Sequence, residues 1–178
     1  MIRLIGLCLL FSAINSYGQE VVKPRPSPLA LVSSRYKDSY VKITYGQPQK
    51  RSREIFGKLV PYGEVWRTGA NESTEITFTK DIMVNGVLTK AATYSLFTIP
   101  EIATWTIILN SELGLWGSYN YNSKLDVLRF QTPVQNLNDL VYESFTIAID
   151  QKNDTADIIL TWDNVKVSFP IQFIDIKP

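Results

Sequence analysis

The sequence contains no histidine and only one cysteine, Cys8. Without imidazole, the chain can form neither a Ser-His-Asp or Cys-His catalytic arrangement nor a His-ligated zinc or iron site. Cys8 lies in an N-terminal segment that we expect to be removed, so we expect the remainder to have no thiol and no disulfide. Any metal bound there would be a hard cation held by oxygen ligands, and no cofactor is predicted.

Long apolar runs are also lacking beyond the N-terminus, so we predict no membrane-spanning helix. Near the N-terminus, a basic residue precedes the apolar run Leu4–Ile14, and the small residues Ser16 and Gly18 follow it. This pattern is typical of a secretory signal peptide over residues 1–18, cleaved between Gly18 and Gln19. We therefore expect an exported protein, periplasmic or extracellular after cleavage.

Neither sign of charge dominates, because the chain has 18 Lys and Arg residues against 17 Asp and Glu residues. Cleavage removes Arg3 and leaves the remainder formally neutral. A neutral chain is not drawn to nucleic acid or to an anionic membrane surface, so we predict no nucleic-acid partner.

The remaining sequence divides into a short leader and one domain. Residues 19–28 contain Pro24, Pro26 and Pro28, which exclude helix and favour an extended tether without a core role. Residues 29–178 are expected to form a single domain with its own core.

Within this domain, apolar and polar residues alternate in short runs, which predicts strands. Asn85-Gly86 predicts a two-residue hairpin turn between the runs 81–84 and 87–90. Pro133 is expected to end a strand, and Pro170 indicates an edge strand or a bulge. The other predicted strands cover residues 40–45, 73–79, 93–99, 104–109, 126–133, 144–150, 156–162 and 165–173.

Helical periodicity is nearly missing, and residues 137–142 are the one candidate for a short helical turn. With about eight to ten short strands and little helix, the expected fold class is all-β. The specific prediction is an antiparallel β-sandwich, with a jelly-roll-like arrangement of its strands.

Residues 60–74 hold the densest mixture of polar and aromatic side chains. Arg67, together with Arg51 and Arg53, is suited to a forked site for carboxylate or phosphate. Alternatively, Arg67 pairs with a neighbouring carboxylate, and this stretch only locks a corner of the fold.

Three further residues of this stretch allow two interpretations each. Asn71 and Glu72 are suited to binding hydroxyl groups, or they satisfy backbone groups of the loop. Trp66 either stacks on a sugar ring or fills the core, and the core is the favoured interpretation.

A second aromatic cluster follows in residues 114–121, where Trp116, Tyr119 and Tyr121 lie in a long loop. These rings either present a recognition surface or fold back to cap one end of the domain.

Carboxylates supply weaker candidates. Glu64 and Glu72, followed by Glu143 and Asp126, could act as an acid/base pair, which requires a separation that a sequence does not define. Residues 150–157 contain three aspartates and could hold calcium, although a solvated turn is favoured.

Several motifs occur in a specific order: Arg53-Glu-Ile-Phe-Gly-Lys-Leu-Val-Pro-Tyr-Gly-Glu-Val-Trp-Arg-Thr-Gly-Ala-Asn-Glu72, Ala92-Thr-Tyr-Ser-Leu-Phe-Thr-Ile-Pro100, Trp116-Gly-Ser-Tyr-Asn-Tyr121 and Asp126-Val-Leu-Arg129. With these motifs, the chain resembles the domain of unknown function 2911 family from Pro28 to Phe173. The resemblance implies an exported protein of Bacteroidota and assigns no activity. Ala92 stands where that family is expected to have a glycine, so this turn is not expected to need a positive φ.

The motif residues lead to a site hypothesis. Arg67, Asn71, Tyr94, Trp116 and Arg129 come from separated segments and would form a polar-aromatic pocket if the strands bring them to one end of the fold. We therefore expect a non-enzymatic binding or accessory domain of the cell envelope, which recognises a small polar or glycan ligand or a protein partner. The alternatives are a carboxylate-based hydrolase or lyase acting on carbohydrate, and a purely structural domain.

Overall fold

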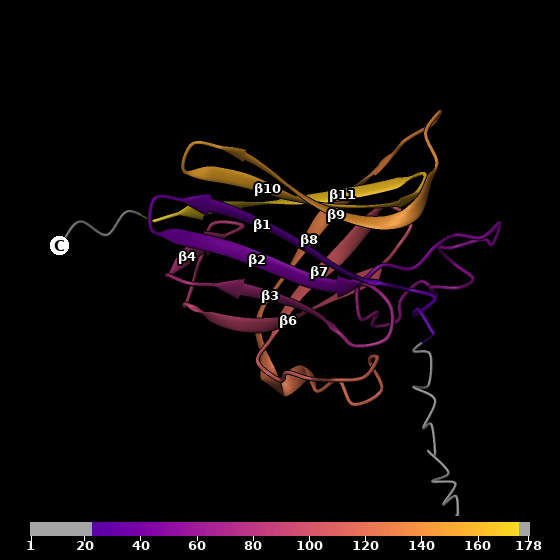
Figure 1. The fold of residues 1–178 in the computed structure, drawn as a ribbon, viewed down its shortest axis with the longest axis horizontal. Coiled ribbons are helices and arrows are strands. Elements are labelled where there is room, and N and C mark those ends of the chain that lie inside the picture. Colours follow the sequence, from indigo (N-terminus) through magenta and orange to yellow (C-terminus); the bar gives the residue numbers. More distant parts are fainter. Residues whose placement is uncertain (1–22, 175–178) are drawn as a thin grey trace, which may run out of the picture.

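The computed structural model describes residues 23–174, so the predicted signal peptide over residues 1–18 lies outside the described residues. Eleven strands and one 3-10 helix, η1, make up the described fold (Figure 1). The elements are β1 (Leu29–Tyr36), β2 (Ser39–Gly46), β3 (Thr74–Phe78), β4 (Ile82–Val84), β5 (Val87–Thr89), β6 (Ala92–Pro100), β7 (Thr104–Asn110), η1 (Ser123–Leu125), β8 (Asp126–Asn136), β9 (Tyr142–Lys152), β10 (Thr155–Asp163) and β11 (Val165–Phe173).

All eleven strands belong to one antiparallel sheet, in the order β1-β2-β3-β6-β7-β8-β11-β10-β9, with the β4-β5 hairpin attached to β11. The predicted all-β antiparallel class is confirmed, but the predicted sandwich is not, because the sheet curves into a nearly closed barrel. The connection runs through β8, which pairs with β7 over residues 126–133 and with β11 over residues 134–136. The sheet therefore continues where a sandwich would have a gap between two layers.

The barrel closes where its two outer strands, β1 and β9, come into contact (Figure 1). At one end of this seam, Gln151 accepts a hydrogen bond from Ser34 and donates one to the Arg35 carbonyl at 3.2 Å. At the other end, the Phe145 N–H donates to the Pro48 carbonyl, and the Ile147 N–H donates to the Tyr45 hydroxyl at 3.1 Å.

Two prolines occupy positions that suit their missing N–H. Pro133 does not end its strand as predicted; it lies where β8 changes partner from β7 to β11. Pro170 lies inside β11, between the part that pairs with β8 and the part that pairs with β4. The Pro170 carbonyl accepts from Asn85 at 2.9 Å, so its nitrogen faces the same side, away from β10. Pro170 thus occupies a local edge within an interior strand.

The backbone conformation of two turns agrees with the predictions made from the sequence. Asn85 and Gly86 have φ values of 47° and 77°, as the predicted hairpin turn requires. Ala92 begins β6 and is not among the described residues with positive φ, in agreement with the prediction for that turn. The helical turn considered for residues 137–142 is reduced to a single turn, in which the Leu140 N–H donates to the Leu137 carbonyl at 3.1 Å, and β9 begins at Tyr142. Strand β1 and helix η1 were not predicted.

The core consists of the inward-facing residues of the barrel wall and a cluster of aromatic rings at one end. The loop between β2 and β3 closes this end and contributes Phe56 and Trp66, which meet Trp105, Phe145 and Trp162 from the wall. Among residues 23–174, no helix is long and apolar enough to cross a membrane.

Candidate functional site

The β2–β3 loop is held against the barrel by backbone hydrogen bonds. Trp66 and Thr98 of β6 exchange two such bonds, at 2.7 and 2.9 Å. The Ala70 N–H donates to the Gly46 carbonyl at 3.1 Å. Thr68 and Asn71 have φ values of 55° and 65°, so the chain turns sharply on both sides of Ala70. The loop therefore has a fixed path, and its side chains have defined directions.

Trp66 points into the barrel and is only 7% exposed. Its indole stacks on Trp162 at 5.9 Å between ring centroids, and the indole N–H donates to the Gly69 carbonyl at 3.1 Å. Of the two interpretations open for this residue, the core role agrees with the structure. Trp66 thereby supports the loop from which the next residue projects.

Arg67 is partly buried and has no charged partner. Its Nε atom is buried without a hydrogen-bond acceptor, and its side chain makes no ion pair within residues 23–174. Burial lowers the pKa of the Arg67 guanidinium, and the neighbouring Tyr119 phenol opposes this effect. Because a guanidinium stays protonated at any physiological pH, the loop holds an uncompensated positive charge away from full solvation.

Arg67 lies between two pockets that share Leu59, Val60, Trp66 and Arg67 as lining residues. The first, here called the basic pocket, has a volume of about 250 Å³ and is also lined by Arg53 and Asn71. No carboxylate lines it among the described residues. The guanidinium of Arg53 donates to the Lys50 carbonyl at 3.0 Å and to the Gln49 carbonyl at 2.5 Å, which positions this charge without neutralising it.

The second pocket, here called the tyrosine pocket, has a volume of about 370 Å³. Tyr119, Ser118 and Glu64 line it together with the apolar residues shared with the basic pocket. Tyr119 is 85% exposed. A Cβ added to Gly117 would lie 2.8 Å from Cε2 and 2.9 Å from Cδ2 of Tyr119, so this edge of the phenol ring lies close to the Gly117 backbone. The exposed ring is therefore held in place by its own loop.

The leader is attached to the same loop. Arg25 donates to both carboxylate oxygens of Glu72, at 2.8 and 2.9 Å, and Asn71 donates to the Ser27 carbonyl at 3.3 Å. Arg51 donates to the Pro26 carbonyl at 3.2 Å. Residues 23–28 of the predicted leader are therefore attached to the domain by hydrogen bonds, and they remain mostly exposed.

Glu72 is held in its ionised form. Backbone hydrogen bonding, followed by the contact with Arg25, lowers the pKa of its carboxyl group below the usual range. Glu72 and Trp116 form an isolated backbone bridge, and Trp116 is 60% exposed beside the site. Trp116 does not line either pocket that contains Arg67.

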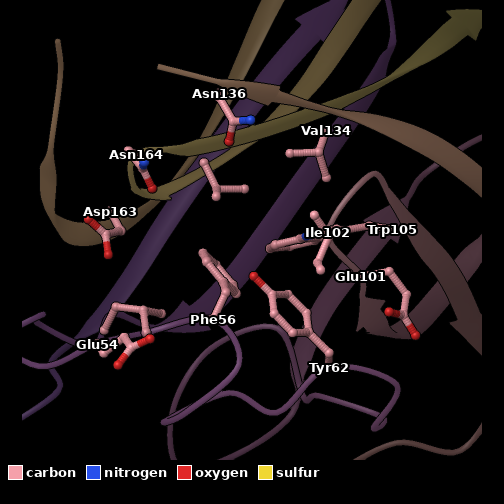
Figure 2. A pocket seen from close by; sticks show the side chains of 12 residues that line it. Glu54, Phe56, Tyr62, Glu101, Ile102, Trp105, Val134, Asn136, Asp163 and Asn164 are labelled. Atoms are coloured by element: carbon pink, nitrogen blue, oxygen red, sulfur yellow. The ribbon is translucent and has the colours of Figure 1, made fainter. Parts of the chain in front are cut away.

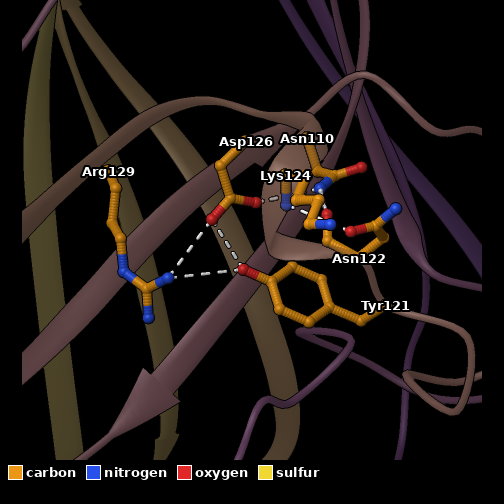
Figure 3. A network of polar contacts seen from close by, with 6 residues as sticks. All are labelled: Asn110, Tyr121, Asn122, Lys124, Asp126 and Arg129. Atoms are coloured by element: carbon orange, nitrogen blue, oxygen red, sulfur yellow. Dashed lines mark hydrogen bonds and ion pairs between the residues drawn. The ribbon is translucent and has the colours of Figure 1, made fainter.

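Tyr94 and Arg129 lie elsewhere. Tyr94 is 4% exposed, packs on Phe78 inside the barrel and donates to the Lys90 carbonyl at 2.9 Å. Arg129 lies on β8 and binds Asp126 at 3.2 Å (Figure 3). Of the five residues of the polar-aromatic hypothesis, Arg67 and Asn71 line the basic pocket together, whereas Tyr94, Trp116 and Arg129 do not line it.

The Arg129 network fixes the end of the loop that carries Tyr119 (Figure 3). Asp126 accepts hydrogen bonds from Tyr121 at 2.6 Å, from Asn110 at 2.9 Å and from Arg129. The Tyr121 ring also packs on Phe97 at 5.1 Å. The ring and the carboxylate thus connect the loop to β6, β7 and β8.

This network predicts a loss of stability at alkaline pH. Burial and the hydrogen bond to Asp126 raise the pKa of Tyr121 from 10.0 to about 12. The folded state therefore retains the phenol proton where the unfolded chain would release it. The contribution to stability is complete below about pH 10 and is lost as the pH rises towards 12. Denaturant unfolding across this range should show a steeper loss for the wild type than for Tyr121→Phe.

Tyr142→Phe is the control for this measurement, because Tyr142 is 40% exposed. Its pH profile should follow that of the wild type. Parallel profiles for the wild type and Tyr121→Phe would contradict the prediction.

A third pocket, here called the acidic pocket, opens at the same end of the barrel and has a volume of about 280 Å³. Glu54 and Asp163 lie on one side of it and Glu101 on the other, with the Tyr62 hydroxyl directed between them (Figure 2). No Lys or Arg is among its lining residues, although Asp163 also pairs with Lys50. Its carboxylates come from three distant segments, and the sequence offered no signal that they would meet.

The remaining carboxylate candidates have local partners. Glu143 accepts a hydrogen bond from the Arg51 N–H at 2.7 Å. In residues 150–157, which form the β9–β10 hairpin, Asp150 pairs with Lys152 at 3.8 Å and Asp154 accepts from Gln172 at 3.2 Å. Across residues 23–174, no three His, Cys, Asp or Glu side chains gather as a metal site would require.

Comparison with known proteins agrees with the motifs. The chain belongs to the family described as "Protein of unknown function (DUF2911)", whose model matches residues 27–171. The matched region includes the whole β2–β3 loop and the loop that carries Tyr119. No curated protein and no solved structure matches the chain. The family description assigns no activity, so the function has to be argued from the pockets themselves.

Proposed function

We propose that this protein is an exported, non-enzymatic binding domain that takes a small anionic ligand in the basic pocket, with Arg67 as the central contact. The observation that carries the proposal is the partly buried Arg67 guanidinium, which lacks a counter-charge within residues 23–174. A buried donor without a partner costs about 1–3 kcal/mol. A bound anion would offset this cost through charge attraction in a poorly solvated place.

The surroundings of Arg67 support an anion of small size. Arg53 adds a second positive charge, and its position is fixed by the two backbone carbonyls that it binds. Asn71 contributes an amide group to the lining of the same pocket. Guanidinium groups match the paired oxygens of carboxylate or phosphate, so these are the chemical classes that we propose.

The two other functions considered from the sequence have less support. A carboxylate-based hydrolase needs a general acid with a raised pKa, whereas the pKa of Glu72 is lowered. A purely structural role for Arg67 would require its donors to be satisfied inside the chain, and Nε is not satisfied. These two observations therefore support ligand binding more than either alternative.

The test is a thermal-unfolding screen of the wild type, Arg67→Met and Arg35→Met with inorganic phosphate and acetate, at constant ionic strength set by chloride. At about ten times its Kd, a bound anion should raise the Tm by about 3–5 °C. We expect this rise in the wild type and in Arg35→Met, whose arginine is exposed on β1. Arg67→Met should show no rise. An equal response of all three proteins, or no response to either anion, would overturn the proposal.

Arg67→Met also has an expected effect without ligand. Because methionine removes a poorly solvated charge and retains most of the apolar stem, the free energy of unfolding should increase by about 1 kcal/mol. Urea unfolding measures this change. A decrease of similar size would indicate that Arg67 serves the fold instead of a ligand.

A further inference from the structure

The tyrosine pocket narrows the class of ligand, and this inference depends on the proposed function. Arg67 lines both pockets, so a ligand whose anionic group contacts this guanidinium can extend into the tyrosine pocket. The volume of about 370 Å³ lies within the range of about 300–1,000 Å³ typical of small-molecule sites. The part of the ligand attached to the anion would therefore be about the size of one ring.

The Tyr119 ring provides a flat surface for such a group. It is 85% exposed, yet its Cδ2–Cε2 edge lies close to Gly117, which has a φ of 72°. Any other residue at position 117 would place a Cβ within 2.9 Å of two ring atoms, so this glycine permits the ring position. A phenol ring has few rotatable bonds, and this one already has a neighbour on one edge, so it loses little conformational entropy when a ligand stacks on it.

The polar groups of this pocket distinguish a sugar from an apolar ring. Glu64 supplies a carboxylate that accepts hydrogen bonds, and Ser118 supplies a hydroxyl that donates and accepts. Glu64 is exposed and Ser118 is partly exposed, so both can reach a ligand. A ring with hydroxyl groups can hydrogen-bond to these side chains, whereas an apolar ring only displaces water from them.

We infer that the ligand is an acidic sugar, a hexuronate unit alone or within a glycan. Its carboxylate contacts Arg67 at the boundary of the basic pocket. The C–H face of the ring stacks on Tyr119, and its hydroxyl groups reach Glu64 and Ser118. The basic pocket supplies the charge, and the tyrosine pocket supplies the selectivity for a sugar ring.

The experiment compares Kd values by isothermal titration calorimetry for glucuronate, acetate, benzoate, glucose and inorganic phosphate. For the wild type, glucuronate should bind about tenfold more tightly than acetate, which corresponds to about 1.4 kcal/mol from the ring contact. Benzoate should bind more weakly than glucuronate, and glucose should not bind measurably. Tyr119→Ala should remove the advantage of glucuronate and leave acetate binding unchanged, whereas Arg67→Met should abolish both.

Tyr40→Ala is the matched control, because Tyr40 is an exposed tyrosine on β2 and lines neither pocket. It should bind glucuronate like the wild type. Equal Kd values for glucuronate and acetate, tighter binding of benzoate, or binding of glucose equal to that of glucuronate would each overturn the inference. If one of these outcomes occurs while phosphate or acetate still binds to the wild type and not to Arg67→Met, only the sugar inference is wrong and the proposed function is retained. If no anion binds, the proposed function and the sugar inference are both wrong.

Discussion

Replacing Trp66 by alanine is expected to lower the free energy of unfolding by about 3–5 kcal/mol. Trp66 is the part of the β2–β3 loop that enters the barrel, where it contacts Phe145 at 5.0 Å and Trp105 at 6.0 Å between ring centroids and stacks on Trp162. Alanine would leave a cavity among large rings that cannot move together to fill it. Urea unfolding followed by circular dichroism measures the loss.

Trp116→Ala is the matched control, because the same side chain is removed from a position that is 60% exposed. We expect a change within about 0.5 kcal/mol. Trp66→Ala should also weaken anion binding, since Arg67 follows Trp66 directly and loses its support. If both variants have similar stability, the loop does not depend on this anchor.

Gly46→Ala is expected to destabilise the protein by about 3 kcal/mol or more, the second large effect. An added Cβ would lie 2.0 Å from the Ala70 carbonyl oxygen and 2.9 Å from its carbonyl carbon. Both atoms belong to the backbone, so no side-chain rotation can relieve the overlap. The hydrogen bond from Ala70 to the Gly46 carbonyl, at 3.1 Å, would have to lengthen or break.

Gly86→Ala separates this steric effect from the conformational preference of glycine. Gly86 has a φ of 77° and no atom within 4 Å of an added Cβ, so alanine there meets only backbone strain. That strain costs about 1–2 kcal/mol. Comparing the unfolding free energies of the two variants tests the close approach of β2 and the loop. A smaller effect at Gly46 than at Gly86 would contradict it.

The fold was predictable from local signals as far as each strand and turn, and no further. Alternation identified most strands, and Asn85-Gly86 identified a turn, because these depend on neighbouring residues. An inward-facing strand alternates in the same way in a sandwich and in a barrel. The distinction depends on β8 pairing with both β7 and β11, a long-range contact without a local signature.

The candidate site was likewise predictable where it depends on residues close in sequence, and not where it depends on long-range contacts. Arg53, Arg67 and Asn71 belong to one loop, so their closeness in sequence was a sound guide to a shared pocket. Tyr94 and Arg129 lie on strands, where position depends on register and face. Because Tyr94 faces the interior and Arg129 binds Asp126, neither reaches the basic pocket. The lack of a partner for Arg67 Nε is a three-dimensional property that no sequence pattern expresses.

The seam between β1 and β9 determines how the barrel can open. Elsewhere around the wall, neighbouring strands are joined by ladders of backbone pairs, for example over the whole length of β1 and β2. At the seam, side chains of Ser34, Gln151 and Tyr45 connect the two sides, and two backbone bonds join β9 to the residues after β2, from Phe145 to Pro48 and from Lys50 to Glu143. No ladder of backbone pairs joins β1 to β9 among the described residues, so we expect this line to open before the laddered strand pairs do. The end beside Ser34 and Gln151, whose connections involve side chains, is then expected to admit water before the aromatic end, where Phe145 is also held by a backbone bond.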